Sequence, residues 1–518
     1  MPAAEVKEEI EINSDFKSAL ELIDAGRNVF VTGRAGTGKS TFLQHFIAGT
    51  KKKAVVLAPT GVAAVNVGGQ TIHSFFALAP GVTAKEAGEE ARGRKNIELF
   101  KKTEAFVIDE VSMVRADLMD CIDVFLRTAL RSEKPFAGKQ MVFIGDLYQL
   151  PPVVTGEEKK AFGTHNNAHY KSQYFFDADV MQGLEFTLIE FGKVYRQSDR
   201  KFIELLNRIR NKTADEPDLK ILNSRALRGA GEEDGCIHLV TTNRMADDIN
   251  FRRLSKIRAQ EYGFRGFVEG KFGMDALPAE LLLRLKAGAQ VMFLANDQMK
   301  RWVNGTIGTI TAIEGEKIRA RLAGGKEVEV TPHVWELFRY RYDHFAGAIE
   351  KESVGAFTQM PLRLAWAITI HKSQGKTFDN AVIDVGRGTF THGQMYVALS
   401  RCRALEGLRI KTPIRMDDIM LDWRIVKFLT RFQYAQAEKN TPEKREILHR
   451  AIKNGSKLRI VYLRPNDEKS TRVITPLAIK QMEYLGHEFE GLEAYCHTKR
   501  GSGTFKVERI LEIGEAGV

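Results

Sequence analysis

A glycine-rich segment close to the amino terminus has residue types suited to holding phosphates. Gly33–Ser40 reads GRAGTGKS, which fits the pattern G-x-x-x-x-G-K-[ST], and it stands between an apolar run and the helix-like stretch Thr41–Ile47. Its glycines let backbone N–H groups close around phosphate oxygens at a helix N-terminus, where the helix dipole favours anions. Lys39 would then reach the β and γ phosphates, and the Ser40 hydroxyl would bind Mg²⁺. The segment predicts a site for ATP and Mg²⁺, with a chance Gly-rich turn as the alternative.

Two later loops carry groups that could act on a phosphate held there. Val107–Glu110 is an apolar run that ends in two acids. Asp109 is placed to help hold Mg²⁺, and Glu110 to take a proton from the attacking water. Gln149, within the segment IGDLYQLPP at 144–152, could orient that water or sense the γ-phosphate. A solvated strand end and a Pro-terminated surface turn are the ordinary interpretations of such segments, and the preceding P-loop favours the catalytic one.

The apolar runs before these loops predict the elements that position them. Short buried-strand patterns alternate with helical ones in the first half of the chain, which favours a parallel sheet with helices on both faces. Ligands of such sheets bind at the carboxyl ends of the strands, where these loops stand. The expected strands are Asn28–Thr32, Ala54–Ala58, Ala105–Asp109 and Gln140–Gly145.

A second alternating region, at 184–422, predicts another α/β domain. Its expected strands are Ile237–Thr241, Ala365–Thr369 and Ala381–Asp384. Between Asp297 and Ala356 the pattern is interrupted by β-runs joined through hairpin signals, which predict a small inserted β-barrel. These runs are Gly305–Ile313, Glu316–Leu322 and Lys326–Val330.

Composition narrows the class of protein. A chain of 518 residues is too long for one hydrophobic core, and 77 Lys and Arg against 66 Asp and Glu leave a formal charge of +11 that suits binding to a polyanion. The four cysteines are scattered, which excludes a close-spaced metal or disulfide framework and favours a reducing compartment. No apolar run approaches the length of a membrane span, and the acidic first residues lack a signal-peptide core. We therefore expect a cytoplasmic protein without membrane contact.

Six phrases in a fixed order resemble the motifs of superfamily-one helicases. APTGVAAVNVGGQTIHSFF at 58–76 is similar to motifs Ia–Ib, VIDEVSM at 107–113 to motif II and GDLYQLPP at 145–152 to motif III. VYRQSD at 194–199 is similar to motif IV, LAWAITIHKSQGKTFD at 364–379 to motif V and YVALSRCR at 396–403 to motif VI. Together they resemble the Pif-one group of DNA helicases, relatives of the RecD-like enzymes, over residues 15–429.

This resemblance implies two RecA-like domains with ATP between them, and five-prime to three-prime translocation along single-stranded DNA. Forked or tailed duplexes would be unwound in replication, recombination or repair. It places Arg196 and Arg401 on the far wall of the ATP cleft, where an inserted arginine stabilises charge that develops on the γ-phosphate. Phe16 stands where the family usually carries an adenine-reading Gln, which leaves stacking or backbone contacts for the base. The implied nucleotide contacts are Gly33, Gly36, Thr37, Gly38, Lys39, Ser40, Thr41 and Gly375.

The same resemblance assigns the contacts with the DNA strand. They are Pro59, Thr60, Gly61, Asn66 and His73 in the first domain, and His371 and Lys372 in the second. Such loops offer small residues and backbone amides to phosphates. Phe75 and Phe76 could either stack bases or fill the core, and the two histidines could equally be structural.

Beyond a polar, helix-like segment that ends at Pro442, short β-runs predict a separate module. They resemble the WYL domain, a bacterial module often fused to nucleic-acid proteins. Glu490 and Gly491 stand in place of the namesake Trp and Tyr, and Leu492 is kept. The module is expected to bind single-stranded DNA or another anionic ligand, or to brace the motor. Its runs are Lys457–Tyr462, Arg472–Pro476, Leu492–Cys496 and Thr504–Ile510.

The predicted organisation is an α/β chain with two RecA-like parallel-sheet domains, a small β-barrel inserted in the second, and a C-terminal β-rich WYL-like domain. Their limits are 1–190, 191–432, 297–356 and 442–518. A monomeric, bacterial, ATP-dependent DNA helicase is the leading functional hypothesis. The alternatives are a ligand-sensing DNA-binding regulator that uses its P-loop ATPase as a switch, and a P-loop ATPase acting on protein or RNA. The motor is favoured because a switch need not keep every catalytic group, and this chain keeps Lys39, Asp109, Glu110, Gln149, Arg196 and Arg401.

Overall fold

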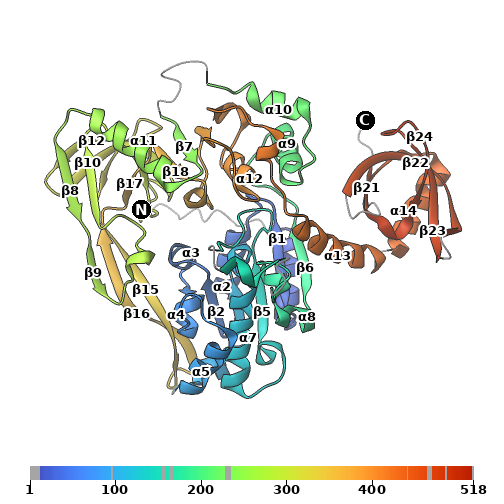
Figure 1. Ribbon diagram of the computed structural model, residues 1–518, viewed down its shortest axis with the longest axis horizontal. Coiled ribbons are helices and arrows are strands. Elements are labelled where there is room, and N and C mark those ends of the chain that lie inside the picture. Colours follow the sequence, from blue (N-terminus) through green and yellow to red (C-terminus); the bar gives the residue numbers. More distant parts are fainter. Residues whose placement is uncertain are drawn as a thin grey trace, which may run out of the picture. The chain divides into compact units, whose positions relative to one another are not determined.

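The computed structural model describes residues 12–94, 97–154, 158–163, 168–227, 235–439, 441–463, 469–484 and 487–515. The chain divides into two units, Met1–Leu421 and Asp422–Val518, whose elements are labelled in Figure 1. No helix in these described ranges is both long and apolar enough to cross a membrane. The four cysteines are free and buried.

The first RecA-like domain is built on a six-stranded parallel sheet in the order β3-β2-β4-β5-β1-β6. The strands are β1 (Val29–Gly33), β2 (Ala54–Ala58), β3 (Gln70–Thr71), β4 (Ala105–Ile108), β5 (Gln140–Ile144) and β6 (Thr187–Phe191). Helices such as α2 (Lys39–Gly49) and α7 (Ala116–Leu130) pack around the sheet (Figure 1). Every residue of β1, β4 and β5 is buried, as expected for parallel strands covered on both faces. The four predicted strands are all present.

The second RecA-like domain has a smaller parallel sheet in the order β18-β7-β19-β20. The strands are β7 (Ile237–Val240), β18 (Ala367–Thr369), β19 (Ala381–Asp384) and β20 (Leu408–Ile410). Helices α9 (Arg200–Arg210) and α12 (Gln394–Leu399) pack against each other in this domain. The predicted pair of RecA-like domains is therefore confirmed.

A β-rich insertion separates β7 from β18 in the chain. One antiparallel sheet contains β11 (Gln290–Phe293), β12 (Ile307–Glu314), β13 (Lys317–Leu322), β14 (Glu327–Val330) and β17 (Leu362–Leu364). The paired strands β8 (Glu261–Arg265) and β10 (Leu282–Lys286) share its hydrophobic core, where the rings of Phe293 and Trp302 lie 4.5 Å apart. These strands lie where the β-insertion is predicted. Its strands extend beyond 297–356 on both sides, because the polar and largely exposed β8 gives only a weak strand pattern.

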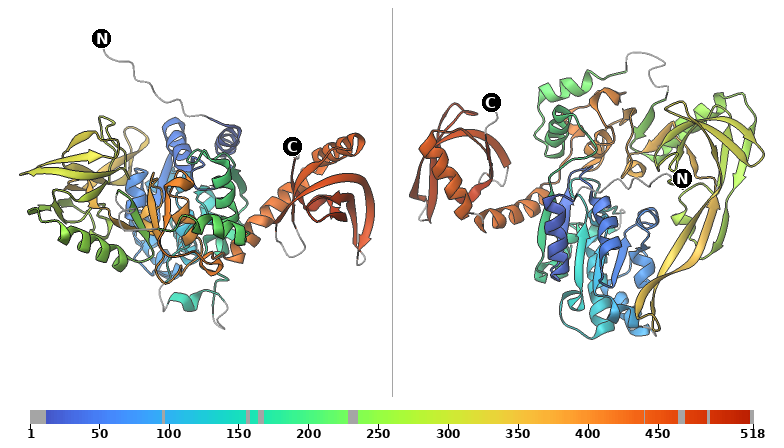
Figure 2. Two further views of the ribbon diagram at one scale, coloured as in Figure 1. Left: turned by 90° about the horizontal axis from the view of Figure 1, so that it is seen from above. Right: turned by 180° about the vertical axis from the view of Figure 1, so that it is seen from behind.

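A long hairpin links the insertion to the first RecA-like domain. It consists of β15 (His333–Asp343) and β16 (Ala348–Gln359), and it runs alongside that domain in Figures 1 and 2. The buried Tyr340 hydroxyl accepts a hydrogen bond from the backbone N–H of Val56 in β2 at 3.1 Å and donates one to its carbonyl at 3.5 Å. On this side of β2, β3 pairs only with residues 57 and 58. Tyr340 therefore satisfies backbone groups that β3 leaves unpaired.

Among its described residues, the second unit contains two α-helices, a short 3-10 helix and one curved antiparallel sheet (Figure 2). The segment predicted to end at Pro442 is α13 (Trp423–Lys439), and Pro442 lies in the first turn of α14 (Thr441–Asn454), where a missing N–H costs no helical hydrogen bond. Leu492, the retained residue of the WYL signature, is fully buried in the core of this unit. The strands are β21 (Leu458–Leu463), β22 (Lys469–Tyr484), β23 (His487–Cys496), β24 (Gly501–Lys506) and β25 (Ile510–Glu515).

Candidate active site and nucleic-acid contacts

The P-loop is shaped by glycines with a left-handed backbone. Gly36 has a φ of 81°, and Gly38, the N-cap of α2, has a φ of 84°. Other residues are strained in this region of backbone space. Gly36 also lies against Arg196, since a Cβ on Gly36 would stand 2.5 Å from the Cβ of Arg196. Glycine at position 36 therefore serves both the turn and the close approach of a residue from the second RecA-like domain.

Lys39 turns its side chain back into the P-loop from the first residue of α2. Its ammonium donates hydrogen bonds to the carbonyls of Gly33 at 2.7 Å and Arg34 at 3.1 Å. Burial lowers the pKa of Lys39, while the negative charges of Asp146 and Glu110 act to raise it. An ammonium held over a loop at a helix N-terminus fits the binding of phosphates. Three other predicted nucleotide contacts lie in the same loop or in the first turn of α2: Thr37, Ser40 and Thr41. Gly375, also predicted, is an exposed residue of the second domain.

Asp109 and Glu110 follow β4, and the carboxylates of both interact electrostatically with Lys39 of the P-loop. Asp109 is 8% exposed, and burial together with the charge of Glu110 raises the pKa of Asp109 to about 7. Burial also raises the pKa of Glu110, whereas the positive charges of Lys39 and Arg401 act to lower it. Glu110 has a φ of 48° and a ψ of 42°, which is strained for a residue with a side chain. The fold thus holds Glu110 in an unfavourable backbone conformation within the field of two cations.

Arg196 and Arg401 belong to the second RecA-like domain and lie close together. Arg401 is 1% exposed, and its guanidinium donates to the Val397 carbonyl at 2.9 Å and to the Ser400 hydroxyl at 2.8 Å. Arg196 donates to the Ser400 carbonyl at 3.3 Å. Burial lowers the pKa of both arginines, and the charge of Arg196 lowers that of Arg401 further. Two desolvated cations held beside each other favour an anion between the domains.

A tyrosine that sequence reasoning did not single out joins the two domains at the P-loop. The hydroxyl of Tyr396, on α12, accepts a hydrogen bond from the backbone N–H of Ala35 at 2.9 Å. Tyr396 opens the phrase similar to motif VI, five residues before Arg401 in the chain. Its place in that phrase was the sequence signal for a functional role of Tyr396. The contact with the phosphate-binding loop is seen only in the fold.

Phe16 lies in the core of the first domain. It is 1% exposed, with the rings of Phe42 and Phe191 at 5.4 and 4.7 Å. Its side chain therefore cannot replace the hydrogen bonds of an adenine-reading Gln. Tyr195 offers a different contact: it is 42% exposed, and its ring would lie 3.7 Å from a Cβ on Gly38. An exposed aromatic face beside the P-loop can stack on a base.

The predicted DNA contacts of the first domain lie on or next to α3 (Gly61–Asn66) and α4 (Ile72–Phe76). The Thr60 hydroxyl caps α3 by accepting a hydrogen bond from the N–H of Ala63 at 3.2 Å. Thr60 and Asn66 are exposed, and Pro59, Gly61 and His73 are partly exposed. Phe75 and Phe76 are buried among other aromatic rings, so they fill the core and do not stack bases.

The predicted contacts of the second domain lie in η6 (His371–Ser373), beside two cations that the sequence did not predict. Burial and the positive charge of Arg363 lower the pKa of Lys372, and the same causes lower that of Lys376 to about 8. Lys376 donates to the Asn304 side-chain oxygen at 2.6 Å. Lys376 belongs to the phrase similar to motif V, whereas Arg363 is brought to this cluster from β17 by the fold. Like charges gathered in this way suit a phosphate backbone.

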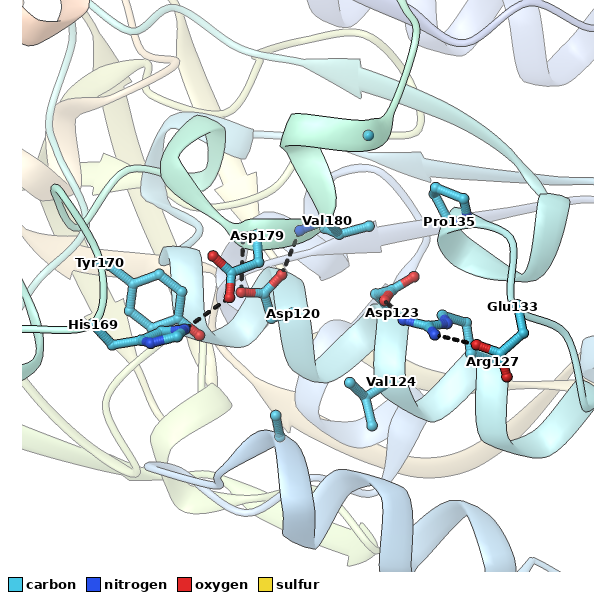
Figure 3. A pocket seen from close by; sticks show the side chains of 12 residues that line it. Asp120, Asp123, Val124, Arg127, Glu133, Pro135, His169, Tyr170, Asp179 and Val180 are labelled. Atoms are coloured by element: carbon cyan, nitrogen blue, oxygen red, sulfur yellow. Dashed lines mark hydrogen bonds and ion pairs between the residues drawn. The ribbon is translucent and has the colours of Figure 1, made fainter.

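A pocket of about 390 Å³ beside α7 lies apart from these loops (Figure 3). Asp120 accepts hydrogen bonds from the backbone N–H groups of Asp179 and Val180 at 3.0 and 2.9 Å. Asp123 accepts one from Phe136 at 2.6 Å. These carboxylates are engaged in holding the local backbone, and the lining of the pocket includes none of the predicted site residues.

Each of the two units contains residues that match a known protein family. Residues 11–220 match the family described as PIF1-like helicase, and residues 443–514 match the WYL domain. The "ATP-dependent DNA helicase Pif1" of Bdellovibrio bacteriovorus is 32% identical over 437 residues, which cover 82% of this chain and 93% of that protein. Pif1 of Bacteroides sp in complex with ADP-AlF4 is 37% identical with a TM-score of 0.75, covering 82% of this chain and 97% of that one. Pif1 helicase from Bacteroides in complex with ADP-AlF3 and ssDNA is also 37% identical, with a TM-score of 0.59 and coverage of 82% and 98%.

Proposed function

Since this chain belongs to the PIF1-like helicase family and is an ATP-dependent DNA helicase, we propose that it moves five-prime to three-prime along single-stranded DNA and unwinds forked or tailed duplexes. One observation supports a motor: the P-loop is bonded across the domain junction, where the N–H of Ala35 donates a hydrogen bond to the Tyr396 hydroxyl of the second domain at 2.9 Å. Hydrolysis at this junction would depend on the arrangement of both domains. That dependence is what a motor needs to convert ATP turnover into movement.

Each group at the junction has a distinct proposed role. Lys39 binds the β and γ phosphates, and Glu110 takes the proton of the attacking water. Ser40 and Asp109 supply the hydroxyl and carboxylate oxygens that Mg²⁺ prefers, and Mg²⁺ bound there would add positive charge beside the phosphates. Gln149 orients the water or senses the γ-phosphate. The charge that develops in the transition state is stabilised by Arg196 and Arg401.

The rest of the nucleotide is held mainly by backbone. Gly33, Gly36, Thr37 and Gly38 offer loop amides, Thr41 extends the first turn of α2, and Gly375 approaches from the second domain. For the base, the exposed ring of Tyr195 provides a stacking surface beside the P-loop. Stacking distinguishes purines poorly, so we expect weaker discrimination between ATP and GTP than a Gln contact would give.

The proposed DNA strand crosses both RecA-like domains. Lys372 would contact phosphates directly, and Arg363 and Lys376 extend this basic cluster. A solved relative in complex with ssDNA supports a strand site in this fold. In the first domain the contacts are Pro59, Thr60, Gly61, Asn66 and His73, and His371 adds one from the second.

A strand-displacement assay tests the direction of movement. Duplexes with a single-stranded tail of either polarity are incubated with the protein, ATP and Mg²⁺, with Glu110→Gln protein as the inactive control. We expect release of the strand only from the five-prime-tailed duplex. Release only from the three-prime-tailed duplex would reverse the proposed direction.

The remaining proposals concern the setting of the motor. We place it in the bacterial cytoplasm as a monomer that serves replication, recombination or repair, with domain limits at 1–190, 191–432 and 442–518 and the insertion at 297–356. The WYL-like module would add a contact with single-stranded DNA or another anion. The family and its catalytic set favour this motor over a regulator that uses ATP only as a switch, and over an ATPase that acts on protein or RNA.

A further inference from the structure

The loop after β5 belongs to the first RecA-like domain, and one of its carboxylates, that of Asp146, also bonds to the second RecA-like domain. The side chain of Asp146 is fully buried. One of its oxygens accepts hydrogen bonds from the Tyr148 backbone N–H at 3.1 Å and from the Arg210 guanidinium at 3.2 Å. The other oxygen accepts a hydrogen bond from the side-chain amide of Gln149 at 3.2 Å. The group proposed to sense the γ-phosphate is thus bonded to an acid that also binds α9 of the second domain.

Two more contacts from the second domain hold this loop. The ring of His392 hydrogen-bonds the carbonyl of Leu147 at 2.9 Å. Gly393, the N-cap of α12, has a φ of 73°, and a Cβ there would lie 2.2 Å from the Gln149 carbonyl oxygen. Only glycine permits this approach. The loop that carries Gln149 is therefore seated directly on α12, which in turn packs against α9.

Arg210 is held at this junction by charge and by an aromatic face. Its guanidinium lies 4.0 Å from the ring centroid of Tyr148 and 3.5 Å from the carboxylate of Glu190. Burial acts to raise the pKa of Asp146, but the charges of Arg210 and Lys39 hold it below its usual value. The pair is therefore ionised, and removal of one member would leave the other as an uncompensated buried charge.

We propose that Asp146 and Arg210 are positioning residues that place Gln149 for the γ-phosphate only when the second domain is docked on the loop. This inference rests on the proposed role of Gln149. Because one carboxylate binds both the amide of Gln149 and the guanidinium of Arg210, displacement of the second domain disturbs the two bonds together. ATP turnover is in this way tied to the position of α9.

The test compares Asp146→Asn, Arg210→Gln and the double variant in the full-length protein. ATP turnover at saturating single-stranded DNA, the KM for ATP and thermal unfolding are measured. We expect kcat to fall at least about 10-fold in all three, with KM changed by less than about two-fold, because the pair acts through Gln149 in the transition state. The single variants should unfold at lower temperature, and the double variant, which removes both members of this ion pair, should regain part of the lost Tm.

If the double variant regains stability but not ATP turnover, Asp146 and Arg210 act on the position of Gln149 and not only on the stability of the fold. A double variant that regained both Tm and kcat would overturn the inference, because the pair would then be structural only. Arg208→Gln is the matched control, since Arg208 lies on α9 like Arg210 and the change breaks a different ion pair, with Asp218 at 2.7 Å. We expect its kcat to stay within about two-fold of the native value. An equal loss in Arg208→Gln would assign the effect to α9 as a whole and also overturn the inference.

Glu110→Gln distinguishes this inference from the proposed function. Normal turnover in Glu110→Gln protein would contradict the proposed catalytic site itself. Inactive Glu110→Gln protein beside a fully active Asp146→Asn variant would leave the site standing and reject only the positioning pair.

Discussion

The nucleotide loops and the DNA-facing loops of this helicase use charge in opposite ways. Around the P-loop, charged groups are buried and matched across the domains, as in Asp146 with Arg210 or Glu110 with Arg401. Along the proposed strand path, Arg363, Lys372 and Lys376 carry like charges, and burial together with the charge of Arg363 lowers the pKa of the two lysines. Buried ion pairs hold the catalytic groups in a fixed geometry, whereas a cluster of like positive charges is suited to binding the phosphates of a DNA strand. The comparison predicts large, geometry-dependent effects at the first region and small, salt-dependent effects at the second.

The largest effect is expected for Glu110→Gln. Loss of the general base should lower DNA-stimulated ATP turnover by up to about 10⁴-fold, while the affinity for single-stranded DNA without nucleotide stays unchanged. Turnover is measured by phosphate release and binding by fluorescence anisotropy. Glu89→Gln, an exposed carboxylate change in the same domain, is the control. A loss of DNA affinity in folded Glu110→Gln protein would break the separation of the two regions.

Arg401→Ala and Arg196→Ala should follow, each lowering kcat on the order of 10³-fold. Their proposed action is on the transition state, so the affinity for ATP should change far less than kcat. Nucleotide titrations and steady-state turnover measure the two quantities. Arg200→Ala, at an arginine whose side chain is 92% exposed on α9, should behave as the native protein. Normal turnover of both cleft variants at saturating ATP would exclude these arginines from the site.

A smaller effect is expected for Lys376→Gln at the strand path. Loss of one phosphate contact should reduce the slope of log affinity against log salt by about 0.7, with kcat at saturating DNA unchanged. Burial lowers the pKa of Lys376 to about 8, so its charge is present below that pH and lost as the pH rises through it. DNA affinity should therefore weaken between pH 7 and 9 (about one unit either side of that pKa) in the native protein and less so in the variant.

Lys326→Gln is the matched control for that measurement, because this exposed lysine lies between β13 and β14, at the end of the five-stranded sheet opposite to β17. Its salt slope and pH dependence should equal those of the native protein. Equal slopes for the native and Lys376→Gln proteins would remove Lys376 from the path.

Removal of residues 442–518 is expected to leave the chemistry of the motor intact. All groups assigned to hydrolysis lie before this module, so ATP turnover at saturating DNA should persist. If the module makes one to three phosphate contacts, the salt slope should shrink by about 0.7 per contact and more DNA should be needed for half-maximal turnover. Titrations of full-length and truncated protein at several salt concentrations measure this. Loss of turnover at saturating DNA would assign the module to the motor.

Sequence patterns predicted those elements whose formation depends on residues close together in the chain. Apolar runs such as Val29–Gly33 and Gln140–Ile144 are buried on both faces, so their composition alone indicates strands. The hairpin strand His333–Asp343 mixes exposed and buried positions without clean alternation, and it was not predicted. Its stability comes from pairing and from contacts with another domain, which no local pattern reports.

The same limit applies to the candidate site. Lys39, Asp109 and Glu110 stand in loops with recognisable spacing, and the fold brings them together. Asp146 and Arg210 are 64 residues apart in the chain, and Arg363 and Lys376 belong to different elements, so their partnerships depend on tertiary structure. Phe75 and Phe76 were ambiguous because adjacent aromatic residues show no periodicity, and only the packing assigns them to the core.

The Tyr340 hydroxyl on the edge of β2 has a consequence for how the protein behaves in a concentrated solution. A strand edge with free N–H and C=O groups is a template on which another chain can add a strand. By covering Val56, the hairpin of the insertion closes part of that template on the first RecA-like domain. A chain shortened by residues 333–359 would expose this edge, and its first domain would be prone to pair with further copies of itself. By this contact the insertion covers part of a strand edge of the ATPase domain that would otherwise be open to another chain.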